Sequence, residues 1–356
     1  MLRIKITPHW ELGREADASL DTTDLLVLLG AVQETGAIAQ GARSLGLSYR
    51  HAWGQIKRAE TLFGHPLLDA GRGRGSTLTP LAEKLIWADR RITARLSPLL
   101  ESLASELENE LDRTLPRQAR ALRIHASHGF AVAALVQQLD LAQLPVELRY
   151  RNSLESVAAL SHGECDLAGF HVPIGEFEQP AALHYRRWLH DDSHRLVHLA
   201  VRTQGLFAAP GNPKRVRSLD DLSRKDLRFV NRPEGSGTRM LTELMLAKRG
   251  VSPSDVTGFE SAEFTHAAVA AFIASGMADV GIGVQTAAHR FGLHFIPLVR
   301  ERYFLALDRA AAERPPMPQV LELLRSSGYR SAVAALVGYE AGETGRVLAV
   351  QEAFGG

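Results

Sequence analysis

The stretch Asn231 to Arg239, NRPEGSGTR, combines two glycines, two hydroxyl side chains and two arginines between the apolar run LRFV and the helical pattern MLTELMLAK. A strand, a glycine-rich turn and a helix start expose backbone N–H groups, and the helix dipole adds about half a positive charge there. The loop is therefore suited to hold an anion. Its candidate ligands are Arg232, Ser236, Gly237, Thr238 and Arg239.

Polar residues also follow other predicted strands. From residue 121 onward strand-like and helix-like segments alternate, which predicts a parallel sheet whose loops gather at one edge. We expect the same anion site to include Ser127, Asn152, Ser153, Thr265, His266, Gly283 and Tyr303. The alternative is that serine, threonine and asparagine at these places simply cap helices.

Motifs for enzymatic chemistry are missing from the sequence. GSGTR lacks the Gly-Lys-Ser/Thr ending of a phosphate loop, and no G-x-G-x-x-G follows the first predicted strand. The single cysteine, Cys165, lies beside an apolar strand and is expected to be buried and inert. We assign no catalytic residue, no metal ligand and no required cofactor. An enzyme on the same kind of fold remains the alternative.

Length and composition predict a globular protein of more than one domain, with 356 residues of which 45% are hydrophobic and 23% charged. The N-terminus has no apolar signal-peptide core, and no run of about 18 apolar residues predicts a membrane span. Together with the single cysteine, these features lead us to expect a cytoplasmic protein.

The N-terminal third carries a concentrated positive charge. Residues 40–95 hold ten Lys and Arg against four acids, a net charge of +6. Residues 37–45 and 49–63 read as two helices joined by a tight turn, with Ser48 as N-cap, which is the helix-turn-helix pattern. We place Tyr49 and Trp53 on the core face of the second helix, and Gln55 on its exposed face.

We expect this second helix and the hairpin after it to bind double-stranded DNA. The hairpin, HPLLDAGRGRGSTLTP, reads as a wing with two arginines at its tip. The candidate DNA contacts are Ser48, Tyr49, Arg50, His51, Gln55, Arg58, Arg72 and Arg74.

A long helix follows the wing, capped by Thr79 with Pro80 in its first turn. One apolar stripe runs along it, and a second copy of the same helix is its simplest partner. This predicts a homodimer on a near-palindromic operator, and leaves open whether dimers pair into tetramers. The stripe contains Leu81, Leu85, Ala88, Ile92, Leu96, Leu99, Leu103, Leu107 and Leu111.

Two resemblances extend these interpretations. TGAIAQGARSLGLSYRHAWGQIKRAETLFG, the wing and LTPLAEKL resemble the DNA-binding domain of molybdate-responsive ModE-like regulators, and more distantly that of LysR-type regulators. GLFAAPGNPK, LRFVNRPEGSGTR and THAAVAAFIASGMADVGIGV resemble the periplasmic-binding-protein fold. The resemblance implies a regulator that senses molybdate or tungstate. A small carboxylate such as formate, or a molybdenum-cofactor-related ligand, fits the same groups.

The predicted fold class is α/β: an all-α winged helix-turn-helix, a linker helix and a two-lobed binding-protein-like clamshell. The DNA-binding domain spans 1–80, the dimerisation helix 81–115 and the sensor 116–356. Lobe 1 covers about 120–200 and 300–356, and lobe 2 about 203–298. Both lobes carry a Gly-x-x-Asp before a strand, at Gly163/Asp166 and Gly276/Asp279, and VTGFE (256–260) is expected to form a strand in lobe 2.

Overall fold

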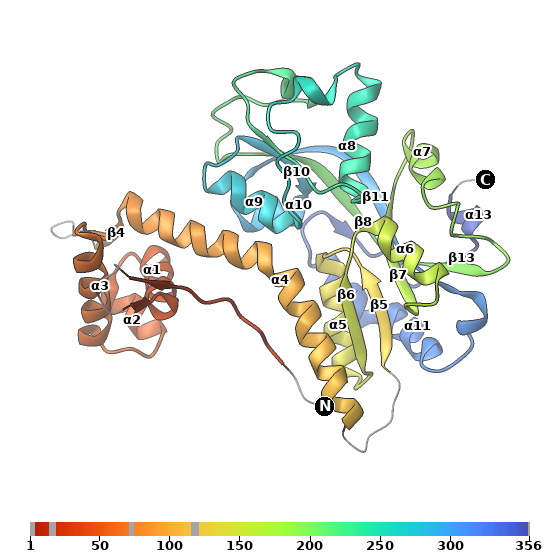
Figure 1. The fold of residues 1–356 in the computed structure, drawn as a ribbon, viewed down its shortest axis with the longest axis horizontal. Helices are drawn as coiled ribbons and strands as arrows, with labels where there is room; N and C mark the ends of the chain where they lie inside the picture. The colour runs from red at the N-terminus through yellow and green to blue at the C-terminus, as the bar shows by residue number, and fades with distance from the viewer. Residues whose placement is uncertain (1–3, 14–18, 71–74, 115–120, 355–356) are drawn as a thin grey trace. The chain divides into compact units, whose positions relative to one another are not determined.

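The structure is a computed structural model that describes residues 4–13, 19–70, 75–114 and 121–354 (Figure 1). The predicted wing-tip contacts Arg72 and Arg74 lie outside these residues. The chain forms two compact units, residues 7–96 and residues 97–356 with the first six. The boundary falls inside the long helix α4, Pro80–Thr114.

The smaller unit is a winged helix-turn-helix, as predicted. Its core is built from apolar residues of the three helices before α4 and from the first turns of α4 itself. Gly36 ends the first helix, and its carbonyl accepts a 2.8 Å bond from Ser76 at the base of the wing. The elements before α4 are β1 Glu11–Leu12, β2 Leu20–Asp21, α1 Thr23–Thr35, α2 Ile38–Ser44, α3 Tyr49–Phe63, β3 Leu68–Ala70 and β4 Ser76–Leu78.

The predicted core face of α3 is partly wrong. Ala52, Ile56 and Ala59 are buried, but Tyr49 and Trp53 are 53% and 40% exposed. Gln55, predicted to be exposed, is buried, and its amide lies 3.1 Å from the His51 ring nitrogen. The buried residues recur at spacings of three and four, so the helix is turned relative to the predicted face.

Helix α4 is continuous through Pro98. Its first turns pack on the helix-turn-helix core through Leu81, Ala82, Leu85 and Ile86. Further along, the predicted apolar stripe is exposed. Its exposed leucines are Leu96, Leu99, Leu103, Leu107 and Leu111.

The larger unit is a two-lobed α/β domain built on one nine-stranded sheet, with the order β6-β5-β7-β11-β8-β10-β9 and with β12 and β13 on β8. Two 15-residue antiparallel strands, β8 His194–Ala208 and β11 His294–Asp308, run through both lobes (Figure 1).

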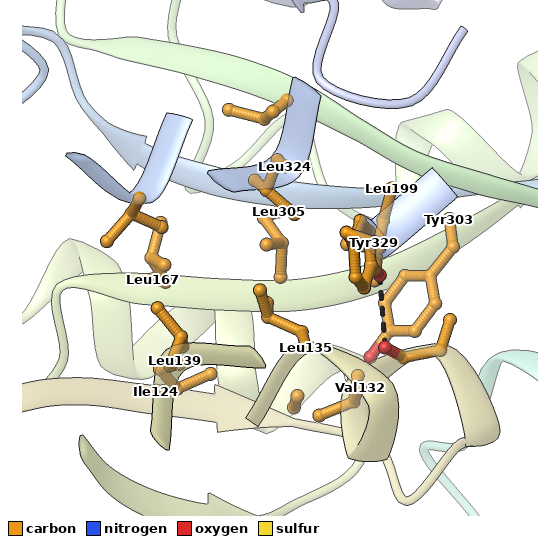
Figure 2. Packing of buried hydrophobic residues seen from close by; sticks show 14 of the residues in the cluster. Ile124, Val132, Leu135, Leu139, Leu167, Leu199, Tyr303, Leu305, Leu324 and Tyr329 are labelled. Atoms are coloured by element: carbon orange, nitrogen blue, oxygen red, sulfur yellow. Dashed lines mark hydrogen bonds between the residues drawn. The ribbon is translucent and has the colours of Figure 1, made fainter. Parts of the chain in front are cut away.

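Lobe 1 contains parallel strands, their crossover helices and the C-terminal helices. Its elements are β5 Leu122–Ala126, α5 Phe130–Leu141, β6 Val146–Tyr150, α6 Ser153–Ser161, β7 Leu167–Pro173, α7 Glu178–Leu183, α11 Met317–Arg325, α12 Ser327–Ala334, β12 Tyr339–Glu340, β13 Val347–Leu348 and α13 Val350–Ala353. Helices α5 and α11 contribute leucines to the core of this lobe, and α12 contributes Val333 and Tyr329, whose hydroxyl donates to the Ala131 carbonyl at 3.0 Å (Figure 2).

Lobe 2 is smaller and has its own apolar core. Its elements are β9 Phe229–Val230, α8 Gly237–Lys248, α9 His266–Ala274, β10 Val280–Val284 and α10 Gln285–Arg290. The predicted strand at 256–260 is wrong. A 3-10 turn, Pro253–Asp255, and tight turns occupy that region, and only an isolated bridge joins Asn231 to Ala262.

The two Gly-x-x-Asp motifs make the same contacts in both lobes. Asp166 accepts bonds from the backbone and guanidinium of Arg123, which also donates to the Gly163 carbonyl. Asp279 repeats this with Arg228 and the Gly276 carbonyl. The internal similarity seen in the sequence is therefore a repeated pair of an arginine and an aspartate, which we call the Arg–Asp clasp.

No single helix in the described ranges is long and apolar enough to cross a membrane. Helices α1 and α2 pass that test only as a pair, bent by 118°, and they supply core residues of the helix-turn-helix.

Candidate functional site: a buried cluster between two lobes

The 231–239 loop of lobe 2 lies directly against lobe 1. A Cβ built on Gly237 would lie 3.5 Å from the Ser153 hydroxyl and 3.7 Å from the Tyr185 hydroxyl. At Gly235, where φ is +78°, a Cβ would lie 2.8 Å from the Asn152 amide nitrogen. Gly235 is thus favoured by close approach and by its backbone conformation, whereas the distances at Gly237 are those of ordinary van der Waals contact. The loop brings together polar groups from both lobes.

Arg232 is the central charge of this region. It is 5% exposed, and one guanidinium nitrogen donates to the Phe264 carbonyl at 2.6 Å. Its Nε has no hydrogen-bond partner among the described residues. Burial, with the nearby Arg202 charge, lowers the pKa of Arg232 to about 9, partly offset by Glu301. A buried cation without its own carboxylate is costly unless a ligand supplies the opposite charge.

Arg202 and Glu301 form a fully buried ion pair, with 2.8 Å between Nε and the carboxylate. They face each other across β8 and β11. One terminal nitrogen of Arg202 has no hydrogen-bond partner in those residues. Since Glu301 is already paired, it cannot also neutralise Arg232.

Three histidines surround the arginines. Burial, and then the charges of Arg202 and Arg232, hold the pKa of His171 well below its usual range. The pKa of His266 is depressed by burial and by the same two charges. Burial and Arg232 lower the pKa of His128 to about 4. The imidazoles are therefore neutral hydrogen-bonding groups at physiological pH.

Lobe 1 contributes hydroxyl groups that are not engaged. The Ser127 and Ser153 hydroxyls are buried and make no hydrogen bond of regular geometry with the described residues, although Tyr185 lies beside Ser153. Tyr303 is fully buried and stacks on His171, with 3.9 Å between ring centroids. We define the interlobe cluster as Ser127, His128, Ser153, His171, Arg202, Arg232 and His266.

The other predicted ligand residues have structural roles. Asn152, Ser236 and Thr265 cap α6, α8 and α9 by accepting backbone N–H groups, so the helix-capping alternative holds for their side chains. Thr238 is buried, and Gly283 packs beside the His266 ring. Arg239 binds Glu243 and Glu260 and stacks on Phe259. Its guanidinium is thus engaged outside the cluster.

Arg202, His128 and His171 were not among the ligand residues predicted from the sequence. The signal for Arg202 was present: it is the one arginine embedded in the apolar pattern LVHLAVRTQGLFA. A charge on a strand with this pattern implies a buried partner, which the structure identifies as Glu301.

The exposed face of α3 is basic and aromatic. Ser48 caps the helix by accepting the His51 N–H, as predicted. Tyr49 stacks on Trp53 with 6.2 Å between ring centroids, and Lys57 lies 4.7 Å from the centre of the Trp53 ring. The predicted contacts Arg50, His51 and Arg58 are exposed, whereas Gln55 is buried and does not share this surface.

The second half of α4 contacts lobe 1 close to the cluster. Ser102 and Ser105 accept the backbone N–H groups of Tyr150 and Leu148 along strand β6. Glu101 lies 4.0 Å from the His128 ring and contacts the Tyr150 hydroxyl. Burial raises the pKa of Glu101. The interlobe cluster is thus linked to α4 through His128.

Other groups in the described residues offer little chemistry. Cys165 is buried, and burial raises the pKa of its thiol to about 12, which confirms the predicted burial. His190 and His194 are spaced by four residues, with 6.2 Å between ring centroids. No group of three or more potential metal ligands occurs within the described ranges.

Comparison with known proteins agrees with this architecture. Residues 134–325 match the model of the PBP superfamily domain, and residues 23–83 match that of the bacterial regulatory helix-turn-helix protein, lysR family. The uncharacterized protein YvgK of Bacillus subtilis is 36% identical over 200 residues, 56% of this chain. The chain spans 64% of the length of YvgK.

Two further relatives are regulatory or molybdenum-related by name. The molybdenum-pterin-binding protein MopB of Rhodobacter capsulatus is 31% identical over 140 residues, 38% of this chain and 51% of MopB. The transcriptional regulator ModE of Yersinia pestis is 40% identical over 65 residues, 17% of this chain and 25% of ModE.

A lysR-type helix-turn-helix and a binding-protein-like domain are thus joined in one chain. The chain belongs to the PBP superfamily, and its residues 23–83 match the helix-turn-helix model of the lysR family. The resemblances stated from the sequence are confirmed.

Proposed function

We propose that this protein is a cytoplasmic, DNA-binding transcriptional regulator whose two-lobed domain senses a small oxyanion, with molybdate or tungstate as the favoured ligand. The observation that carries the proposal is Arg232, a buried cation without its own carboxylate among the described residues. The unengaged hydroxyls and neutral imidazoles around it are hydrogen-bond donors suited to oxygen atoms.

The molybdenum assignment has separate support. One relative is named as a molybdenum-pterin-binding protein, and the N-terminal residues resemble ModE. A tetrahedral dianion presents oxygens in four directions, which suits donors that converge from two lobes. A flat carboxylate such as formate would engage fewer of them.

DNA recognition is assigned to α3 and the wing. Arg50 and Arg58 project from the exposed face of α3 and carry no acidic partner in the described residues. Arginine can pair with base edges or with phosphates. We expect Arg50→Ala to weaken operator binding by about 1–3 kcal/mol.

Gln55 is the matched control for this assignment, because it lies on the same helix but is buried. Gln55→Ala should lower thermal stability and leave the affinity of the folded protein for DNA near that of the wild type. If Arg50→Ala and the wild type bind the operator with equal affinity in a gel-shift titration, α3 is rejected as the DNA-recognition helix.

A homodimer through α4 completes the proposal. Five leucines spaced by three and four residues are exposed along α4 from Leu96 to Leu111. The same stripe on a second copy of the chain would bury these leucines. The two helix-turn-helix domains of the dimer would then bind a near-palindromic operator. Leu99→Glu with Leu103→Glu should shift the protein toward monomers in analytical ultracentrifugation. An unchanged mass would exclude the leucine stripe of α4 as the dimer interface.

A thermal-shift screen against oxyanions and small carboxylates tests the sensing function. The proposal expects stabilisation of the wild-type protein by molybdate or tungstate, which scales with RT ln(1 + [L]/Kd). Arg232→Met should abolish the thermal shift at anion concentrations near the Kd of the wild type. Stabilisation by nucleotides alone, or by none of the anions, would reject the proposed ligand class.

A further inference from the structure

One edge of the nine-stranded sheet is closed by a helix and not by another strand. Strand β6 stands at the end of the strand order, and β5 is its only strand partner in the described residues. The outer N–H groups of an edge strand need other acceptors. Two hydroxyls of α4 supply them: Ser105 accepts the Leu148 N–H at 2.9 Å, and Ser102 accepts the Tyr150 N–H at 3.0 Å. We call these two contacts the serine dock.

Both hydroxyls of the serine dock also donate their protons. Ser102 donates to the Pro98 carbonyl at 2.8 Å, and Ser105 donates to the Val146 carbonyl at 3.4 Å. Ala104, which lies between the two serines, is buried. The orientation of each hydroxyl is therefore fixed, and the second half of α4 is held against lobe 1 over about one helical turn.

The serine dock leaves the leucine stripe of α4 available. At about 100° per residue, Ser105 lies about 200° around the helix from Leu103. The two faces therefore point in nearly opposite directions. Helix α4 can contact lobe 1 and a second copy of itself at the same time.

Strand β6 leads from the serine dock to the interlobe cluster. Asn152, two residues after Tyr150, caps α6, and its side-chain amide is the group that Gly235 of lobe 2 approaches. The next residue, Ser153, belongs to the cluster. The Tyr150 ring also packs edge-on against His128, with 4.8 Å between ring centroids. A ligand that draws lobe 2 against the end of β6 therefore acts on the strand that α4 holds.

Resting on the proposed function, we infer that the serine dock is the contact through which anion binding changes DNA affinity. Ser102 and Ser105 are positioning residues that act through α4. The helix is continuous from Pro80 to Thr114, and its first turns belong to the helix-turn-helix core. A shift of its docked half is thus passed along the helix to the DNA-binding domain.

Gel-shift titration of the full-length protein, with and without saturating molybdate, measures this coupling on an operator selected from random-sequence DNA. For the wild type we expect the two operator affinities to differ by about 5- to 150-fold. Ser102→Ala with Ser105→Ala should bring their ratio close to one. Molybdate affinity, measured by calorimetry, should stay within about twofold of the wild type.

Two further double variants serve as controls. Ser102→Thr with Ser105→Thr keeps both hydroxyls and should retain the molybdate response. Ser161→Ala with Ser275→Ala removes two hydroxyls that donate to carbonyls of their own helices, and should also respond as the wild type does. If the double alanine variant of the dock does not fold, each single alanine variant should lose part of the response.

Hydrogen exchange measures the serine dock without any ligand. The Leu148 and Tyr150 amides should be protected in the wild type, and should exchange about tenfold faster in the double alanine variant, with the rest of lobe 1 unchanged. Rapid exchange of these two amides in the wild type overturns the dock.

The outcomes separate this inference from the proposed function. A full response in the double alanine variant, or molybdate binding that leaves wild-type operator affinity unchanged, overturns the dock as the link and leaves anion sensing intact. Loss of molybdate binding in that variant also overturns it, because the serines then support the anion site itself. Failure of every anion to bind the wild type overturns both. A lost response at unchanged molybdate affinity, retained in the threonine variant, supports the inference.

Discussion

The two lobes share a framework but use it differently. Each places a strand, a polar loop and a helix beside a repeated Arg–Asp clasp. In lobe 2 the hydroxyls of Ser236 and Thr265 cap helices, and the loops supply charge through Arg232. In lobe 1 the cap of α6 is Asn152, which leaves the next residue, Ser153, unengaged. A hydroxyl at a helix start is thus a ligand candidate only when another residue does the capping.

The largest effect is expected from lobe 2. Arg232→Met should lower oxyanion affinity by about 100-fold, because a charge-assisted contact is lost from a buried site. The unliganded variant should unfold at the same temperature as wild type or higher, since a buried unpaired cation is removed. Calorimetry of binding and unfolding measures both quantities.

Arg228→Met is the matched control, because Arg228 lies in lobe 2 and pairs with Asp279 at the surface. It should leave anion affinity unchanged. If the Arg232→Met protein is destabilised but still binds the anion, Arg232 has a structural role and is not a ligand of the anion.

The next largest effect is expected from the histidines, on the pH dependence of stability. Since the pKa values of His128, His171 and His266 are lowered on folding, the unfolded chain binds more protons below about pH 6.5. Stability without ligand should fall as pH drops from about 6.5 toward 4, by on the order of 1 kcal/mol per pH unit for each histidine. Urea unfolding at pH 7 and pH 5 measures the loss, and equal midpoints would contradict it.

Substitution of the serine and threonine hydroxyls gives the sharpest test of the difference between the two lobes. Ser127→Ala and Ser153→Ala should each weaken anion binding by about 1 kcal/mol and leave stability nearly unchanged. Ser236→Ala and Thr265→Ala should instead cost about 1 kcal/mol of stability through lost caps, with little change in affinity. The comparison fails if all four substitutions behave alike in paired binding and unfolding measurements.

The smallest effect concerns communication with α4. Glu101→Gln should leave anion affinity within about twofold, but should reduce the anion-induced change in DNA affinity, which is typically 1–3 kcal/mol in coupled systems. Glu106→Gln, which breaks an exposed pair with Arg149 one turn along the same helix, should retain the full response. Equal responses in the two variants would exclude the Glu101–His128 contact as the link.

Much of the fold could be predicted because its signals are local. Ser48, Thr79 and the glycine turns mark helix boundaries, and the two Gly-x-x-Asp motifs reveal the repeat. The α3 face was misjudged because the first-turn residue Tyr49 lies beyond the edge of the core, while Gln55 is buried with His51 as its polar partner.

The site was harder to predict, because it depends on contacts between side chains that are far apart in the sequence. Arg202 and Glu301, for example, are separated by 99 residues. Arg232, in the loop, and Arg239, in the first turn of α8, are seven residues apart, yet one is left without a carboxylate and the other binds two. Nothing in the local sequence distinguishes them. The pairing of Arg202 with Glu301 is likewise set by the register of β8 and β11.

Crystals of the protein soaked in tungstate test the central claim most directly, because tungsten can be located by its anomalous scattering. We expect one strong anomalous peak per chain within hydrogen-bonding distance of Arg232 and of the Ser127 or Ser153 hydroxyl. A peak elsewhere on the chain, with the interlobe cluster unoccupied at saturating tungstate, would contradict it.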